Sequence, residues 1–246
     1  MKMKFAIGAI FLSVYLVFVI ATIPAKVVLS YVPLPTGISV HGVKGTIWQM
    51  DIDELVHPKV TISKIEANLS FWSLFTLNPS ISVEFGDNFS DGPAGQLTVS
   101  NLFENVRVED ADIRISANFI AQQMPLPIPL NASGEVNVNI EKFVVGKPIC
   151  QLSQGDIKWP SAAVSALNET VKLGTLAAKL SCEQGALAII VDEENDLGVS
   201  FTAYVRSKGV SGNGYLKPAR NFPEKLQAVL PFLGKVDQQG RYRLSF

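Results

Sequence analysis

The stretch from Phe5 to Ile23 constrains this chain more than any other. Its sequence, FAIGAIFLSVYLVFVIATI, contains no charged residue. As a helix that rises about 1.5 Å per residue, it would span roughly the hydrocarbon core of a bilayer. We therefore predict a transmembrane helix that begins at Phe5 and ends at Ile23.

A cleaved secretory signal and a buried core helix are the alternatives for this stretch. A signal would share the basic start, but its apolar region is typically about 7 to 15 residues long and ends in a small-x-small site. Here the run is longer and ends in Ala-Thr-Ile-Pro. A core helix that is apolar on every face needs surrounding protein to bury it. An uncleaved anchor is the favoured interpretation.

The charges beside this stretch predict its orientation. Lys2 and Lys4 precede it, and only Lys26 lies close behind it. Basic residues favour the cytoplasmic side of a membrane helix. We therefore expect residues 1–4 to form a cytoplasmic tail and the bulk of the chain to be exported. Residues 24–37 carry three prolines and a glycine, which predicts a juxtamembrane stem.

Beyond the stem, the pattern indicates strands. Residues 38–48, 60–71 and 106–116 nearly alternate apolar and polar side chains and are rich in β-branched residues. Further strands are predicted at residues 80–85, 96–99, 134–145, 155–159, 174–180, 187–191, 198–205, 209–217 and 240–245. Turn sequences separate them, so residues 38–246 are predicted to form an all-β, mainly antiparallel domain with one protected face. A sandwich, a partly closed barrel and a curved groove all fit.

Two segments interrupt the strand pattern. Residues 124–130, MPLPIPL, hold three prolines that cannot sit in a central strand. We expect a stiff crossover there that divides the β domain into two halves. Residues 222–233 place apolar side chains at helical spacing after Pro223, which predicts one short C-terminal helix.

The two cysteines, Cys150 and Cys182, both fall in the exported part. An oxidising compartment would let them pair, so we predict a disulfide that stabilises the fold by roughly 3 to 4 kcal/mol. Neither belongs to a CxxC motif, which argues against redox catalysis.

The chain lacks the sequence patterns of the common catalytic and binding sites. A net charge of -1 gives no basic field for nucleic acid, and GxSxG, P-loop, GxGxxG and HExxH motifs are absent. The acidic clusters at residues 51–54 and 192–196 could supply calcium oxygens, but charged turn residues are the commoner explanation. We expect no catalytic, metal-binding or cofactor-binding residue and no small-molecule substrate.

A set of motifs, in order along the chain, resembles protein N of the bacterial type II secretion system. The set begins with GVKGTIW at residues 42–48, continues with GDIKW after Cys150 and GNGYLKP at 212–218, and ends with QGR at 239–241. Met50 departs from the family pattern, which often has glycine there. The positions taken as family motif are Gly42, Gly45, Thr46, Trp48, Gly240 and Arg241.

The resemblance implies a non-enzymatic, single-pass inner-membrane protein with a periplasmic β domain. It implies other inner-membrane or periplasmic secretion subunits as partners, in a machine that exports folded proteins across the outer membrane. Small residues at Ala6, Gly8, Ala9 and Ser13 suggest a helix contact with such a partner. The alternative is a membrane-tethered protein whose curved sheet binds or bridges lipid; a periplasmic enzyme is the third candidate. Gly42 and Gly45 are expected to allow a bulge or a close backbone approach in a strand, and Trp48 is expected to pack in the core.

Overall fold

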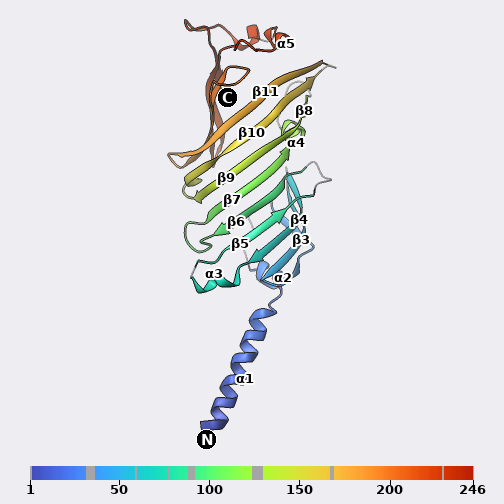
Figure 1. The fold of residues 1–246 in the computed structure, drawn as a ribbon, viewed down its shortest axis with the longest axis vertical. Helices are drawn as coiled ribbons and strands as arrows, with labels where there is room; N and C mark the ends of the chain where they lie inside the picture. Colours follow the sequence, from blue (N-terminus) through green and yellow to red (C-terminus); the bar gives the residue numbers. More distant parts are fainter. Residues whose placement is uncertain are drawn as a thin grey trace.

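A free-standing helix and a long β-sheet make up the chain in its computed structural model. The structure describes residues 2–31, 37–58, 60–76, 78–87, 92–123, 130–166, 169–228 and 230–245. Helix α1 (Lys2–Ala21) projects from one end of the sheet, and the short helix α2 (Ala25–Leu29) follows it (Figure 1). The C-terminal segments lie at the opposite end of the molecule.

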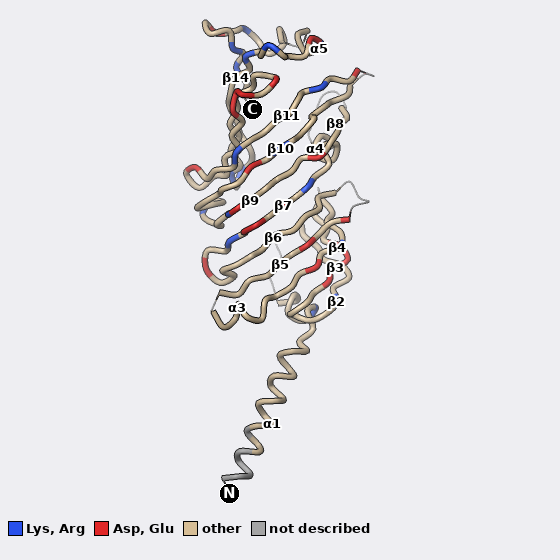
Figure 2. Tube along the Cα trace, viewed as in Figure 1, with Lys and Arg blue, Asp and Glu red and all other residues tan. Residues whose placement is uncertain are grey.

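Helix α1 is largely exposed where its side chains are described. All of its described side chains, at residues 7–8 and 10–21, are exposed, and Figure 2 shows no charge on this part of the helix. Within the described residues, no helix combines the length and apolarity that crossing a membrane requires.

The fifteen strands found among the described residues belong to one sheet, and each of their pairings is antiparallel. The strands are β1 (Ser39–His41), β2 (Lys44–Gly45), β3 (Gln49–His57), β4 (Val60–Leu69), β5 (Ile81–Phe85), β6 (Ala94–Ser100), β7 (Arg107–Ser116), β8 (Asn131–Ser133), β9 (Glu135–Val145), β10 (Cys150–Ala166), β11 (Glu169–Glu183), β12 (Ala186–Val191), β13 (Val199–Arg206), β14 (Gly209–Leu216) and β15 (Tyr242–Ser245). The remaining helices are α3 (Phe71–Phe75), α4 (Ala117–Gln123), α5 (Glu224–Gln227) and the 3-10 helix η1 (Leu230–Leu233).

The sheet is open. Its path runs from β1 through β3, β4, β5, β6, β7, β9, β10, β11, β12, β13 and β14 to β15, while β2 pairs with β3 and β8 with β10. Within the part of the chain that the structure describes, no pairing joins β1 to β15. The sequence left a sandwich, a partly closed barrel and a curved groove open; the described strands form a single open sheet.

The sheet has one apolar face, because apolar and polar residues alternate along its strands. Neighbouring strands place apolar residues opposite one another, as in Ala67 against Val83 and Val83 against Leu97. Strand β7 has a bulge at the point where apolar and polar residues stop alternating in its sequence. There the register with β6 shifts beside Asp110, whose φ is 51°. An extra residue in one strand turns the following side chains over. Val108 and Ile113, an odd number of residues apart, thus both belong to the apolar face.

This face is incompletely covered. The chain exposes 16735 Å², whereas a compact protein of 26.7 kDa exposes about 11,000 Å²; the projecting helix α1 and the open sheet both contribute to this difference. Most of the buried apolar residues that the structure describes are alanines, and three of them, Ala117, Ala121 and Ala132, form a core cluster where α4 packs on β8. Val83, Leu97 and Val108 remain partly exposed.

Most of the predicted strands are present, with differences at particular places. Strand β3 was not predicted, and the expectation that Asp51, Asp53 and Glu54 are turn residues is wrong, because they lie within it. Pairing with β4 over most of its length outweighs the low strand propensity of its acidic residues. Residues 192–198 form the predicted turn.

Of the two predicted interruptions, the crossover stays a prediction, and the C-terminal helix differs from the sequence expectation. Residues 124–129 of the predicted crossover lie outside the described residues. Strands β7 and β9, which lie before and after this segment in the chain, pair with each other. The predicted helix at 222–233 is two short pieces, α5 and η1. Pro231, which has no N–H to donate, lies in the second piece.

Candidate functional site

The junction between α1 and the sheet brings together most of the first sequence motif. The indole N–H of Trp48 donates to the carbonyl oxygen of Ile20 at 3.1 Å. The backbone N–H of Ile47 donates to the carbonyl of Ile23 at 3.1 Å, and Pro24 forms an isolated antiparallel bridge with Thr46. The motif therefore holds the C-terminal end of α1 against the first strands.

The glycines of the motif shape the turn that makes this contact. Gly45 has a φ of 83°, and a Cβ there would lie 2.2 Å from the carbonyl oxygen of Gln49. That oxygen accepts the backbone N–H of Thr46 at 2.8 Å, and the Thr46 hydroxyl accepts the N–H of Trp48 at 3.3 Å. Only glycine combines the left-handed backbone with this close approach.

Trp48 does not pack in the core, contrary to expectation. It is partly buried and lies in the α1 junction, where its ring centroid is 5.4 Å from that of Phe71. The carbonyl oxygen of Ile20 lies near the end of α1, so no later residue of the helix donates an N–H group to it. It needs a hydrogen-bond donor from another part of the chain. The Trp48 indole is that donor.

Helix α3 carries an exposed group of aromatic residues beside this junction. Phe71, Trp72 and Phe75 expose 52%, 77% and 69% of their surface, and the centroids of Phe71 and Phe75 are 5.2 Å apart. With Trp48 they form the aromatic collar, a name used below for these four residues. Helix α3 was not predicted, because the expected strand extended to Phe71. The consecutive aromatic residues after Ser70, which break the alternation, were the available signal.

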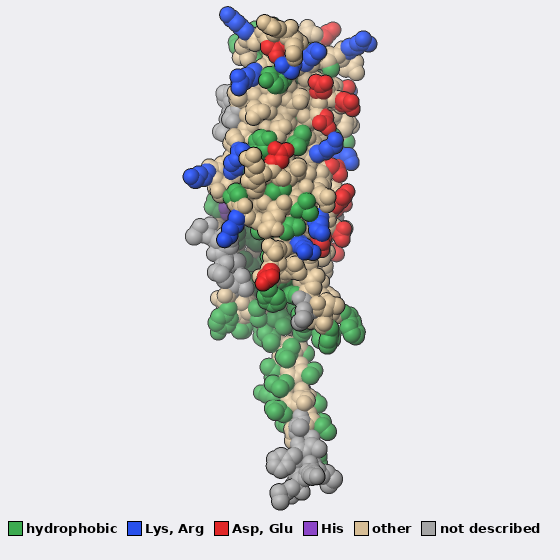
Figure 3. All heavy atoms as spheres, turned by 90° about the vertical axis from the view of Figure 1, so that its left-hand side faces the viewer, with side chains coloured by type: hydrophobic (Ala, Val, Ile, Leu, Met, Phe, Trp, Pro, Cys, Tyr) green, Lys and Arg blue, Asp and Glu red, His purple; other side chains and the backbone are tan. Residues whose placement is uncertain are grey.

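An apolar hollow connects α1 to the collar. It has a volume of about 440 Å³, and its walls are Val17, Ile20, Ala21, Trp48, Leu69 and Phe71. Figure 3 shows hydrophobic side chains gathered at this end of the β domain and along α1, while charged side chains are spread over the rest of the domain. The six residues that line this hollow have apolar side chains, and none of them carries an acid–base group.

The predicted disulfide is present. Cys150 and Cys182 form an S–S bond across 32 residues and join the beginning of β10 to the end of β11. Cys150 is only 2% exposed. The bond lies far along the sheet from the α1 junction, so its contribution is to the fold of the central strands.

The C-terminal motif forms a turn that leads into β15. Asp237 accepts the backbone N–H groups of Gln239 and Arg241 at 2.8 and 2.9 Å and the Arg241 Nε at 2.9 Å. These bonds, that from the Arg241 backbone first, hold the pKa of the Asp237 carboxyl below its usual value. Gly240 has a φ of 74°, and the Arg241 guanidinium lies 4.2 Å from the Tyr215 ring centroid.

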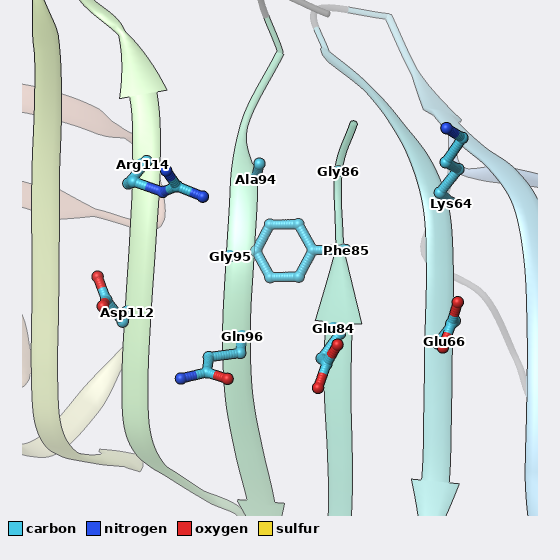
Figure 4. A pocket seen from close by; sticks show the side chains of 10 residues that line it. All are labelled: Lys64, Glu66, Glu84, Phe85, Gly86, Ala94, Gly95, Gln96, Asp112 and Arg114. Carbon is cyan, nitrogen blue, oxygen red and sulfur yellow. The ribbon is translucent and has the colours of Figure 1, made fainter. Parts of the chain in front are cut away.

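A polar hollow of about 560 Å³ lies on the other face of the sheet, over β4 to β7 (Figure 4). Glu66 and Glu84 are directly opposite each other, and Gln96 separates Glu84 from Asp112. Among the described residues, no three or more His, Cys, Asp or Glu side chains are grouped so that they could hold a metal ion. The hollow is an open polar surface of the sheet.

Comparisons with known proteins agree with the motifs. The family model described as type II secretion system (T2SS), protein N matches residues 36–245. The chain belongs to the type II secretion system protein N family. No solved structure matches it.

Full-length relatives carry the family's name. A type II secretion system protein N from Aeromonas hydrophila is 29% identical, with 100% of this chain and 98% of the relative aligned. Those from Vibrio cholerae serotype O1 and Pectobacterium carotovorum are 25% and 27% identical, with 97% and 98% of each relative aligned. Membership of this family implies a secretion component and other secretion subunits as partners.

Proposed function

We propose that the chain is a non-enzymatic, single-pass inner-membrane component that assists the assembly or function of the type II secretion machine. Residues 5–23 would cross the membrane with residues 1–4 in the cytoplasm, and residues 38–246 would lie in the periplasm behind the stem at 24–37. Its partners would be other inner-membrane or periplasmic subunits of the machine.

One observation carries this proposal: an uncovered apolar helix is fastened at its end to the sheet. Leu16, Val17 and Phe18 expose 50%, 66% and 64% of their surface to their surroundings. If these large apolar side chains were exposed to water, the free-energy cost would be about 25 cal/mol for each Å² of apolar surface. Insertion into lipid removes that cost, and residues 2–4 then supply the positive flank.

The test combines insertion with secretion in a strain that lacks the gene. A variant with Leu16→Lys and Val17→Lys is expected to be extracted from membranes by alkaline carbonate and to leave secretion of exoproteins impaired. The matched control, Leu16→Val with Val17→Leu, should remain in the membrane and restore secretion. Unimpaired secretion in the deletion strain would contradict the proposed role.

The small residues of α1 are proposed as a contact for a partner helix. Gly8 is exposed and no atom lies within 4 Å of the position of a Cβ there. The side chains of Ala6 and Ala9 lie outside the described residues. Small residues allow membrane helices to approach closely, so Gly8→Leu should reduce crosslinking to partner subunits, whereas Leu12→Val, with a side chain of similar size, should not.

A second candidate function is lipid binding along the apolar face of the sheet. The observation that favours it is the partial exposure of this face, together with the large accessible surface of the chain. Acyl chains would remove the apolar side chains from water. Mass spectrometry of organic extracts from the purified full-length protein tests this, since stoichiometric phospholipid is expected if the face binds lipid and none if it does not.

A further inference from the structure

We propose that the aromatic collar is a membrane-interface site, which binds the headgroup and upper acyl region of phospholipids on the periplasmic side. The proposal rests on the anchoring role of α1. It goes beyond anchoring because it gives the β domain a second contact with the bilayer and thereby a defined orientation.

The collar has the chemistry of interfacial protein segments. Residues 69–76, LSFWSLFT, contain no charge, and Trp72 and Phe75 expose 77% and 69% of their surface. Trp and Tyr concentrate where membrane helices meet water, because such a ring has an apolar body and a polar edge. The hydroxyls of Ser73 and Thr76 bond to the backbone carbonyls of Ser70 and Ser73, so these polar groups are satisfied within the segment.

The collar also lies at the level where α1 would leave the bilayer. Helix α1 has 20 residues, which corresponds to about 30 Å and to the thickness of the hydrocarbon core. Trp48 bonds to the carbonyl of Ile20, at the end of this length. The aromatic rings of α3 are therefore fixed beside the C-terminal end of α1.

The apolar surface is continuous from α1 to α3. The hollow at the junction has walls from both, including Val17, Ile20 and Phe71. Edge-to-face packing links Trp48 to Phe71 and Phe71 to Phe75, so that the rings form a connected group. A lipid acyl chain lying against α1 would contact this group without crossing polar surface.

This contact would set the direction of the sheet. The strands β3 and β4 and helix α3 lie at the α1 end of the molecule, and the C-terminal strands lie at the far end (Figure 1). With α1 alone, the β domain could tilt about the stem. With the collar in the interface, the sheet would extend from the membrane into the periplasm.

The experiment uses tryptophan quenching by phospholipids brominated at the 6 and 7 carbons of one acyl chain. The full chain is reconstituted into vesicles of phosphatidylethanolamine and phosphatidylglycerol. Trp159→Phe retains Trp48 and Trp72, the two collar tryptophans. The control, Trp48→Phe with Trp72→Phe, retains only Trp159, whose indole donates to the carbonyl of Ser133 within the β domain.

We expect brominated lipid to lower the fluorescence of the collar variant by about half and to leave that of the control nearly unchanged, since only the collar would lie at the acyl boundary. Flotation with vesicles and resistance to alkaline extraction report anchoring separately. A protein that is anchored by these criteria but shows equal quenching in both variants overturns the collar proposal. A protein that is extracted overturns the anchor.

Discussion

Trp48 donates its indole N–H to the carbonyl oxygen of Ile20 at 3.1 Å, across 28 residues of sequence. This bond joins the strand motif to the end of α1 and is supported by the Ile47 N–H to Ile23 carbonyl bond beside it. Together the two bonds fix the end of α1 against the first strands of the sheet.

Trp48→Phe should loosen the α1 junction while keeping most of its apolar contacts. A net loss of about 0.5 to 1.5 kcal/mol is expected for one such hydrogen bond. Limited proteolysis in detergent should cleave residues 21–25 faster than in the wild type. Trp159→Phe, which removes an equivalent indole bond to Ser133, is the control and should leave cleavage at these residues unchanged.

Gly45→Ala should destabilise the motif more than Gly240→Ala. Both positions have positive φ, at 83° and 74°, so both substitutions incur a backbone cost of about 1 to 2 kcal/mol. Only at Gly45 would the Cβ also meet a backbone oxygen, that of Gln49 at 2.2 Å; no atom lies within 4 Å at Gly240. Urea unfolding should give a loss of about 3 kcal/mol for Gly45→Ala; equal losses would contradict the role of the close approach.

Removal of the disulfide should destabilise the β domain. The bond closes a loop of 32 residues, and the loop-entropy estimate for this length is about 3 to 4 kcal/mol. Cys150→Ser with Cys182→Ser should therefore lower the urea midpoint. A reductant should lower the wild-type midpoint similarly and leave the double variant unaffected, whereas an effect of the reductant on the variant would point to a different cause.

Asp237 should contribute to stability in a pH-dependent way. Its folded-state pKa lies below its usual value, so its contribution is present above the unfolded pKa of about 3.9 and is lost as the pH falls through the folded pKa. The difference in urea midpoint between the wild type and Asp237→Asn should be steady above about pH 5 and shrink below about pH 4.

Repeating the Asp237→Asn comparison in a background that also carries Arg241→Gln separates the contribution of the Arg241 side chain to the lowered pKa from that of its backbone. The bond from the Arg241 backbone is the largest contribution to the lowered pKa, and this substitution leaves the backbone N–H in place. Much of the pH dependence should therefore remain in this background. A midpoint difference that stays constant down to pH 3 would show that the carboxylate does not stabilise the turn.

The sequence determined the elements whose pattern is local. Alternation in residues such as those of β7 and β11 predicts strands because successive side chains on a strand point to opposite faces. The uncharged run after Phe5 predicts a helix, and two cysteines in an exported chain predict a bond. These inferences need only composition and spacing. The acidic strand β3 was missed because its stability comes from pairing with β4, which local propensity does not contain.

Only the tertiary structure decided how these elements meet. It showed that the sheet stays open and that Trp48 lies at the end of α1, since both depend on contacts between segments far apart in sequence. The same holds for α3: Phe71 resembles the end of a strand until its neighbours are known. Aromatic residues signal burial in a sequence, but whether they face a core or remain exposed beside a helix end is decided by what the fold places against them.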